Sequence, residues 1–248
     1  MAKYKEAEEF ENRSIQIKQK ASASGRTSPK SFISIHDGLS TSYVTLARIY
    51  RELGRTEDAE RAFQSAVLEM TTARGNEGRR VAIMKNYQAE FYAAEGQNLH
   101  LAERLEEESL AILKTGFQPD HWFVSRSFYT LAGIRAQQGK RDEAESLYKQ
   151  ALTNLQVKLG PSHPEVAAAQ AGLGQLYLEE GRYAEAESLL KQALAIRERI
   201  EPNHPYVADL LDTWARLMQR TGRVSEAKEA SARAQAIREK VRAAYENH

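Results

Sequence analysis

Apolar residues recur with a helical period in the stretch from His163 to Arg199. Its first half places large apolar residues on one helical face, with small Ala and Gly between them: Val166, Leu173, Leu176 and Tyr177. Its second half carries a broader stripe of the same period: Ala186, Leu189, Leu190, Ala193, Leu194 and Ile196. Gly181 separates the halves, and glycine tolerates the left-handed conformation that ends a helix. Because neither helix can bury its stripe alone, the stretch predicts an antiparallel helical hairpin.

The glycine between the two helices recurs with spacings of 42, 43, 42 and 41 residues, at Gly54, Gly96, Gly139, Gly181 and Gly222. A small residue precedes each glycine by seven positions, and a helix-start alanine follows each. A fixed period near 42 residues predicts a solenoid of stacked hairpins. The predicted fold is therefore an all-α solenoid over residues 39–248, with five repeats at about 39–78, 79–120, 121–162, 163–203 and 204–246.

Residues 1–20 align with the second helix of a repeat, which places Phe10 at the position of Leu189 and Ile17 at the position of Ile196. We therefore expect this segment to be a half repeat, and the chain to begin in the middle of a repeat. Residues 21–38 are rich in Ser, Thr, Gly and Pro, which predicts a flexible linker. A linker of this length can reach roughly 60 Å. The first helix could thus dock on its own chain or exchange with a second copy.

The last predicted helix has a narrow apolar stripe, and Ser231 and Gln235 stand where the other repeats have apolar residues. A narrow stripe covers the helix in front and leaves nothing for a further repeat behind. This pattern predicts a C-terminal cap.

Composition restricts the classes of partner. The chain has 35 basic and 34 acidic residues and a net charge of +1, which argues against a strongly electrostatic nucleic-acid binder. No apolar run approaches the ~18 residues of a membrane span. The first residues, MAKYKEAEEF, lack the apolar core of a signal peptide. We therefore expect a cytoplasmic protein with no nucleic-acid partner and no membrane insertion.

Two groups of residues could suggest chemistry. His121, His163 and His204 share one register, but they stand one repeat apart, roughly 20 Å, which is too far to share a metal ion. We interpret them as loop residues beside helix caps. The run Glu106–Glu108 is interpreted as a solvated helix face. The sequence shows no phosphate-binding loop, no Ser/His/Asp arrangement and no cysteine. We therefore predict no catalytic residue, metal or cofactor, and a protein that is not an enzyme.

Three motifs indicate a known family. A small residue and Tyr precede the break glycine (Ala47/Tyr50, Ala89/Tyr92, Gly174/Tyr177), Ala59/Phe63/Ala66 follows the first one, and LGPSHPEV joins two repeats. With these motifs the chain resembles tetratricopeptide repeats, of the 42-residue kind found in kinesin light chains. The resemblance covers about 39–246 and the half repeat at 4–20. It implies a right-handed superhelix whose first helices line a concave groove that binds peptides.

The family's groove positions, carried over repeat by repeat, are Arg48, Asn86, Glu90, Arg126, Tyr129, Gln175, Asp212 and Arg216. Kinesin light chains usually carry an asparagine pair in each first helix. The equivalents here are Val44/Thr45, Asn86/Tyr87, Tyr129/Thr130, Ala171/Gly172 and Asp212/Thr213, so only Asn86 matches. The carboxylate clamp of chaperone-binding members is not matched either. The resemblance thus implies a scaffold for a protein or peptide partner without identifying it.

Scattered arginines in the groove suit an acidic peptide or a C-terminal carboxylate. Two other interpretations stay open. The chain could be a sensor or regulatory arm of a larger multidomain protein, or a self-assembling scaffold that forms a homo-oligomer through residues 4–20. Single-stranded RNA would require a continuous basic track lined with aromatic residues, of which the sequence has only pieces.

Overall fold

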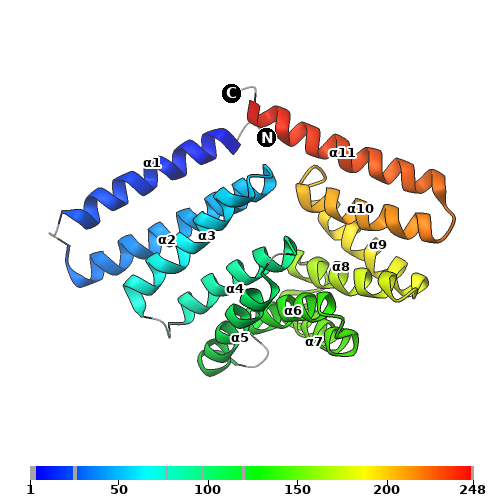
Figure 1. The fold of residues 1–248 in the computed structure, drawn as a ribbon, viewed down its shortest axis with the longest axis horizontal. Coiled ribbons are helices and arrows are strands. Elements are labelled where there is room, and N and C mark those ends of the chain that lie inside the picture. Colours follow the sequence, from blue (N-terminus) through cyan, green and yellow to red (C-terminus); the bar gives the residue numbers. More distant parts are fainter. Residues whose placement is uncertain (1–3, 25–26, 76–77, 97, 119–120, 247–248) are drawn as a thin grey trace. The chain divides into compact units, whose positions relative to one another are not determined.

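The computed structural model describes residues 4–24, 27–75, 78–96, 98–118 and 121–246, and this part of the chain consists of helices joined by short connections (Figure 1). The helices are α1 (Tyr4–Ala23), α2 (Pro29–Glu52), α3 (Thr56–Arg74), α4 (Arg79–Ala94), α5 (Leu99–Gly116), α6 (Trp122–Gln137), α7 (Arg141–Leu159), α8 (Pro164–Glu179), α9 (Tyr183–Ile200), α10 (Pro205–Arg220) and α11 (Val224–Glu246).

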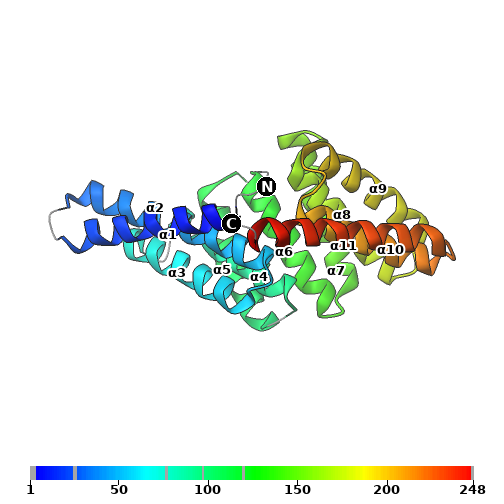
Figure 2. The same cartoon turned by 90° about the horizontal axis from the view of Figure 1, so that it is seen from above.

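The helices pack in sequential pairs within two compact units, residues 1–117 with 242–248, and residues 118–241. In the first unit, α1 packs on α2, and the pairs α2/α3 and α4/α5 follow one another. In the second unit, α6/α7 and α8/α9 are pairs, α9 packs on α10, and α8 also contacts α6 and α10. We call α2, α4, α6, α8 and α10 the first helices and α3, α5, α7, α9 and α11 the second helices (Figure 2). The predicted all-α solenoid of hairpins is confirmed.

The five break glycines set the register of the pairs. Each adopts a left-handed backbone conformation, with φ between 64° and 79°. A side chain at such a position would strain the backbone, so glycine is the residue that allows the sharp turn between the two helices of a pair. The glycines at which the sequence predicted a break between two helices are therefore the positions at which the chain turns.

Three of the first helices begin with a histidine cap. The Nδ1 atoms of His121, His163 and His204 each accept a hydrogen bond, at 3.2 Å, from the backbone N–H two residues further on. This bond satisfies one of the free N–H groups at a helix start. The interpretation of these histidines as residues beside helix caps is confirmed.

The prediction of a flexible linker at 21–38 is wrong, apart from residues 25–26, which lie outside the described residues. Helix α1 continues to Ala23 and α2 begins at Pro29. Ser28 caps α2 by accepting a hydrogen bond from the Ser31 N–H, and a proline suits the first helical turn. Lys30, Ser31 and Ser34 lie on the outside of α2, whereas His36 is 8% exposed and Leu39 is 1% exposed. The first helix of this repeat is therefore longer than expected and starts about ten residues earlier.

Candidate functional site

The eight predicted groove residues all lie on first helices, and the structure gathers them into two groups. In the first unit, Arg48 lies on α2, and Asn86 and Glu90 lie on α4. In the second unit, α6, α8 and α10 carry the remaining five: Arg126, Tyr129, Gln175, Asp212 and Arg216. The contacts of each residue decide whether it is accessible to a partner.

Asn86 is buried between the two helices of its own pair. Its side chain is 2% exposed, and Nδ2 donates a hydrogen bond of 2.8 Å to Oε2 of Glu106 on α5. Ser109, one turn along α5, donates to the Ala82 carbonyl at 2.8 Å. Glu106 itself has no exposed surface, so the interpretation of Glu106 as part of a solvated face is wrong, although Glu107 and Glu108 are exposed. The asparagine supplies the donor that a buried carboxylate requires.

Arg126 is also engaged within the fold. It is 8% exposed, and its Nη1 lies 2.5 Å from Oε1 of Glu165 at the start of α8. A charged hydrogen bond at this distance is strong, and this one joins the first helices of two successive repeats. Arg126 therefore positions α8 beside α6.

Asp212 has a cationic partner from the last helix. Nη2 of Arg238 on α11 lies 2.7 Å from Asp212 and 2.8 Å from Asp209, so one guanidinium binds two carboxylates of α10. Arg216, one turn beyond Asp212, is exposed, and among the described residues its guanidinium donates to Thr213 Oγ1 at 3.3 Å. The acidic charge of α10 is thus paired within the fold, whereas Arg216 faces solvent.

Three predicted residues of the second unit remain accessible on successive first helices, Tyr129 on α6, Gln175 on α8 and Arg216 on α10. Because α8 contacts both α6 and α10, the three lie along one continuous layer. Gln175 is exposed and its amide donates to Glu179 at 3.2 Å. We call these three residues the first-helix face. In the first unit, the exposed Arg48 lies over the Tyr87 ring, 4.7 Å from its centroid, and Glu90 is half-buried.

Tyr148 of α7 packs against Tyr129 of the first-helix face. Its ring centroid lies 5.9 Å from that of Tyr129, and it is 5% exposed. Burial raises the pKa of the Tyr148 hydroxyl, so the phenol stays neutral. Gly172 of α8 lies directly over the ring, and a Cβ added there would come within 2.5 Å of Tyr148 Cε1. The absence of a side chain at Gly172 therefore lets α8 settle against α7.

A recurring ion pair, which the sequence analysis missed, joins successive repeats. Glu145 of α7 accepts from the Tyr177 hydroxyl at 2.7 Å and lies 3.1 Å from Nη1 of Arg182. Hydrogen bonds from Lys149, Tyr177 and Arg182 lower the pKa of Glu145 to about 2. Arg223 and Glu187 form the same pair one repeat later, 2.6 Å apart. A signal was present, because a Glu follows four of the five helix-start alanines and a basic residue follows four of the five break glycines.

Within the described ranges, no group of three or more His, Asp or Glu residues could hold a metal ion. None of the described helices combines the length and the apolar character that crossing a membrane requires.

Comparisons with known proteins place these features in context. Two family models described as tetratricopeptide repeat match the chain, one over residues 123–199 and 165–240, the other over residues 40–68. A search of curated protein sequences finds no match.

Several solved structures are similar. BtubC (BKLC) from P. vanneervenii superposes with a TM-score of 0.64 at 20% identity, covering 95% of this chain and 91% of that one. A putative kinesin light chain of Podosopora anserina with nearly identical TPR-like repeats has a TM-score of 0.53 at 27% identity, covering 81% and 95%. A Rap protein complexed with competence and sporulation factor has a TM-score of 0.67 at 17% identity, covering 87% and 57%.

Proposed function

Because this chain belongs to the tetratricopeptide repeat family, we propose that it is a protein–protein interaction scaffold that binds a peptide or a helix of a partner on its first-helix face. The observation that carries the proposal is the continuous layer of α6, α8 and α10, which presents Tyr129, Gln175 and Arg216 on three neighbouring helices. The remaining predicted residues of this unit, Arg126 and Asp212, are occupied by partners within the fold.

The three side chains suit an extended segment of polypeptide. The Gln175 amide can donate to a backbone carbonyl and accept from a backbone N–H of the same peptide. The Tyr129 ring offers apolar area with little loss of conformational entropy on binding, because tyrosine has only two side-chain torsions. Arg216 offers the fork of N–H donors that carboxylates accept best. A face with these groups favours a peptide with an apolar side chain followed by an acidic one.

The charge of the face supports an acidic partner. Arg238 contacts both Asp209 and Asp212, so these two carboxylates of α10 share one guanidinium from α11. Arg216 contacts a neutral hydroxyl. Among the described residues, the exposed Arg216 guanidinium forms no ion pair, so it can bind a carboxylate of the partner, either from Asp or Glu or from a chain terminus.

The proposal can be tested by selecting binders from a random peptide library on the intact chain and measuring the affinity of the selected peptides by fluorescence anisotropy. Arg216→Glu should weaken binding more than tenfold, and Gln175→Ala several-fold. Arg199→Glu is the matched control, because Arg199 is an exposed arginine on the second helix α9, and this variant should change the affinity less than twofold. Circular dichroism should show that all three variants keep the helical content of the parent chain.

If Arg199→Glu and Arg216→Glu weakened peptide binding equally, the effect would be one of overall charge, and the first-helix face would not be the binding site. The acidic partner would be contradicted if the selected peptides were not enriched in Asp or Glu, or did not prefer a free C-terminal carboxylate over an amide. The proposed binding face would not be affected by this result.

A further inference from the structure

Helix α1 occupies the place of a second helix in front of α2. Nη1 of Arg55 lies 3.0 Å from Glu8, which directly follows Ala7, just as Glu145 follows Ala144. Arg55 directly follows a break glycine and lies over the Tyr50 ring at 4.3 Å from its centroid, as Arg182 does over the Tyr177 ring at 3.7 Å. The contact between α1 and α2 therefore reproduces the contact between one repeat and the next.

In a complete pair such as α8/α9, a neighbouring side of the second helix packs on its own first helix. In α9 that side includes Leu189 and Leu190, because a Cβ added at Gly174 of α8 would lie 3.4 Å and 3.0 Å from their side chains. Phe10 stands at the position of Leu189 and is 70% exposed. Ile17 stands at the position of Ile196, which is 9% exposed, and is itself 61% exposed. The side of α1 that would cover a first helix is therefore open, and it keeps large apolar residues.

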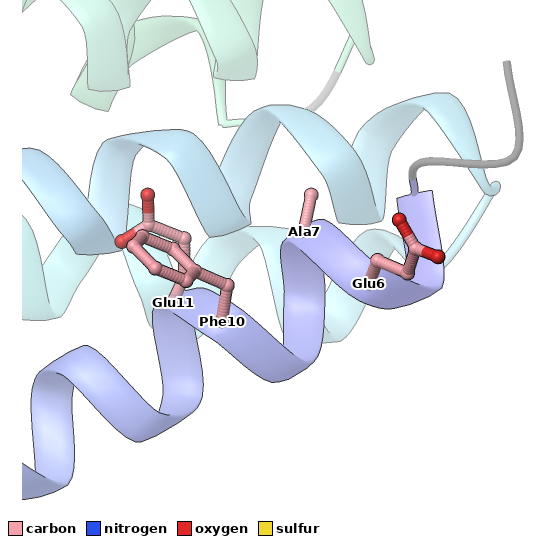
Figure 3. A pocket seen from close by; sticks show the side chains of 4 residues that line it. All are labelled: Glu6, Ala7, Phe10 and Glu11. Atoms are coloured by element: carbon pink, nitrogen blue, oxygen red, sulfur yellow. The ribbon is translucent and has the colours of Figure 1, made fainter.

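The polar residues on this side of α1 match those of one particular second helix. Ala7, Glu11 and Ser14 have the spacing of Ala102, Glu106 and Ser109 in α5. In α5 the glutamate accepts from Asn86 of α4, and the serine donates to the backbone carbonyl of Ala82 of α4. Among the described residues, the side chains of Glu11 and Ser14 form no hydrogen bond or ion pair. Figure 3 shows Glu6, Ala7, Phe10 and Glu11, which line a shallow pocket on α1.

We propose that this side of α1, consisting of Ala7, Phe10, Glu11, Ser14 and Ile17, binds an α-helix of another polypeptide that carries asparagine between two small residues, as α4 does with Ala82, Asn86 and Ala89. The asparagine donates to Glu11, and a backbone carbonyl one turn earlier accepts from Ser14. The small residues let the two helix axes approach to the 8–10 Å of ordinary helix packing over Phe10 and Ile17. This surface is distinct from the first-helix face and does not depend on the function proposed for it.

A second copy of α1 fits this surface less well than an α4-like helix does. It would present Phe10 and Ile17 in place of small residues, and two such rows of large side chains keep the helix axes apart. An α4-like helix also matches both polar groups at once, because α4 satisfies the equivalent pair Glu106 and Ser109 within this chain. The complementarity therefore favours a partner helix of this chemistry.

The probe for the test is a synthetic peptide with the sequence of residues 79–94, labelled with a fluorophore and held helical by a staple placed away from the positions of Ala82, Asn86 and Ala89. Its binding to the intact chain is measured by anisotropy. Phe10→Arg in the chain, or Asn86→Leu in the peptide, should weaken binding at least tenfold. Val157→Arg is the matched control, because Val157 is 77% exposed on α7, and it should leave the affinity within twofold.

Two results would overturn the proposal. The first is a peptide that does not bind, or that binds Phe10→Arg as well as the parent chain, which would place its contact elsewhere, for example on α5. The second is a chain that self-associates in sedimentation velocity and becomes monomeric on Phe10→Arg, because the occupant of this surface would then be a second copy. Circular dichroism of Phe10→Arg checks that α1 remains helical.

Discussion

Replacing Gly172 with alanine perturbs the tightest contact beneath the first-helix face. The new Cβ would lie 2.5 Å from Cε1 and 2.8 Å from both Cζ and the hydroxyl oxygen of Tyr148. These atoms belong to a side chain that is 5% exposed, so the ring has little room to rotate away. The helix α8 must therefore move outward, and the contact between the pairs α6/α7 and α8/α9 is loosened.

Two effects of opposite sign set the magnitude. Alanine in place of glycine inside a helix favours the folded state by about 1 kcal/mol. Overpacking of a well-packed core costs about 1–3 kcal/mol, and a clash with two ring carbons and the hydroxyl oxygen belongs at the upper end. The net expectation is a loss of about 2 kcal/mol in the free energy of unfolding, or a fall of about 4–8 °C in Tm for a protein of this size.

Gly133→Ala is the matched control, because Gly133 is also half-buried on a first helix and faces the same tyrosine. Its added Cβ would meet only the Tyr148 hydroxyl, at 3.3 Å. This variant should be neutral or up to about 1 kcal/mol more stable than the parent. Urea denaturation followed by circular dichroism measures both. If Gly172→Ala were as stable as Gly133→Ala, the close approach of α8 to Tyr148 would be refuted.

Three further predictions concern the core, the ion pairs and a cap. Leu190→Ala removes a side chain with no exposed surface and should cost about 3 kcal/mol in urea denaturation, whereas Leu68→Ala, at a residue that is 65% exposed, should change stability by less than about 0.5 kcal/mol. The pKa values of Glu145 and Glu187 are about 2, against 4.5 ordinarily, so their contribution should be complete above about pH 4.5 and disappear as the pH falls toward 2. Between pH 4.5 and pH 2, the free energy of unfolding of the variant that carries both Glu145→Gln and Glu187→Gln should therefore fall less than that of the parent chain. Ser28→Ala removes the α2 cap and should cost about 1 kcal/mol, with faster hydrogen exchange in the first turn of α2.

The helix pairs could be predicted because their signals are local. Each break glycine needs a left-handed conformation, and each cap acts on an N–H two or three residues away, so a short stretch of sequence contains both partners of the interaction. The start of α2 was missed for the opposite reason. A cluster of Ser, Thr, Gly and Pro was interpreted by composition, although Ser28 followed by Pro29 is also the pattern of a cap and a first helical residue.

The contacts of the site residues depend on partners far along the chain. The period placed Asn86 and Arg126 on the correct helices, but Glu106 stands 20 residues from Asn86 and Glu165 stands 39 residues from Arg126. No local sequence pattern predicts these contacts, because the packing of the helices sets the distance between the two side chains of each contact. The sequence therefore could not show which predicted groove residues of the second unit stay accessible. The packing of the helix pairs shows that these are Tyr129, Gln175 and Arg216.

Stacking and recognition use different positions of the repeat. Residues that hold successive repeats together recur, as Glu145 with Arg182 and Glu187 with Arg223 show. The position of Tyr129, in contrast, is occupied by Ala171 in the next repeat and by Asp212 in the last. Because each repeat of a solenoid contacts only its neighbours, a change on the accessible layer leaves the stacking contacts intact. The fold can therefore combine a uniform scaffold with a face whose chemistry differs from one repeat to the next, and it is this face that selects the partner.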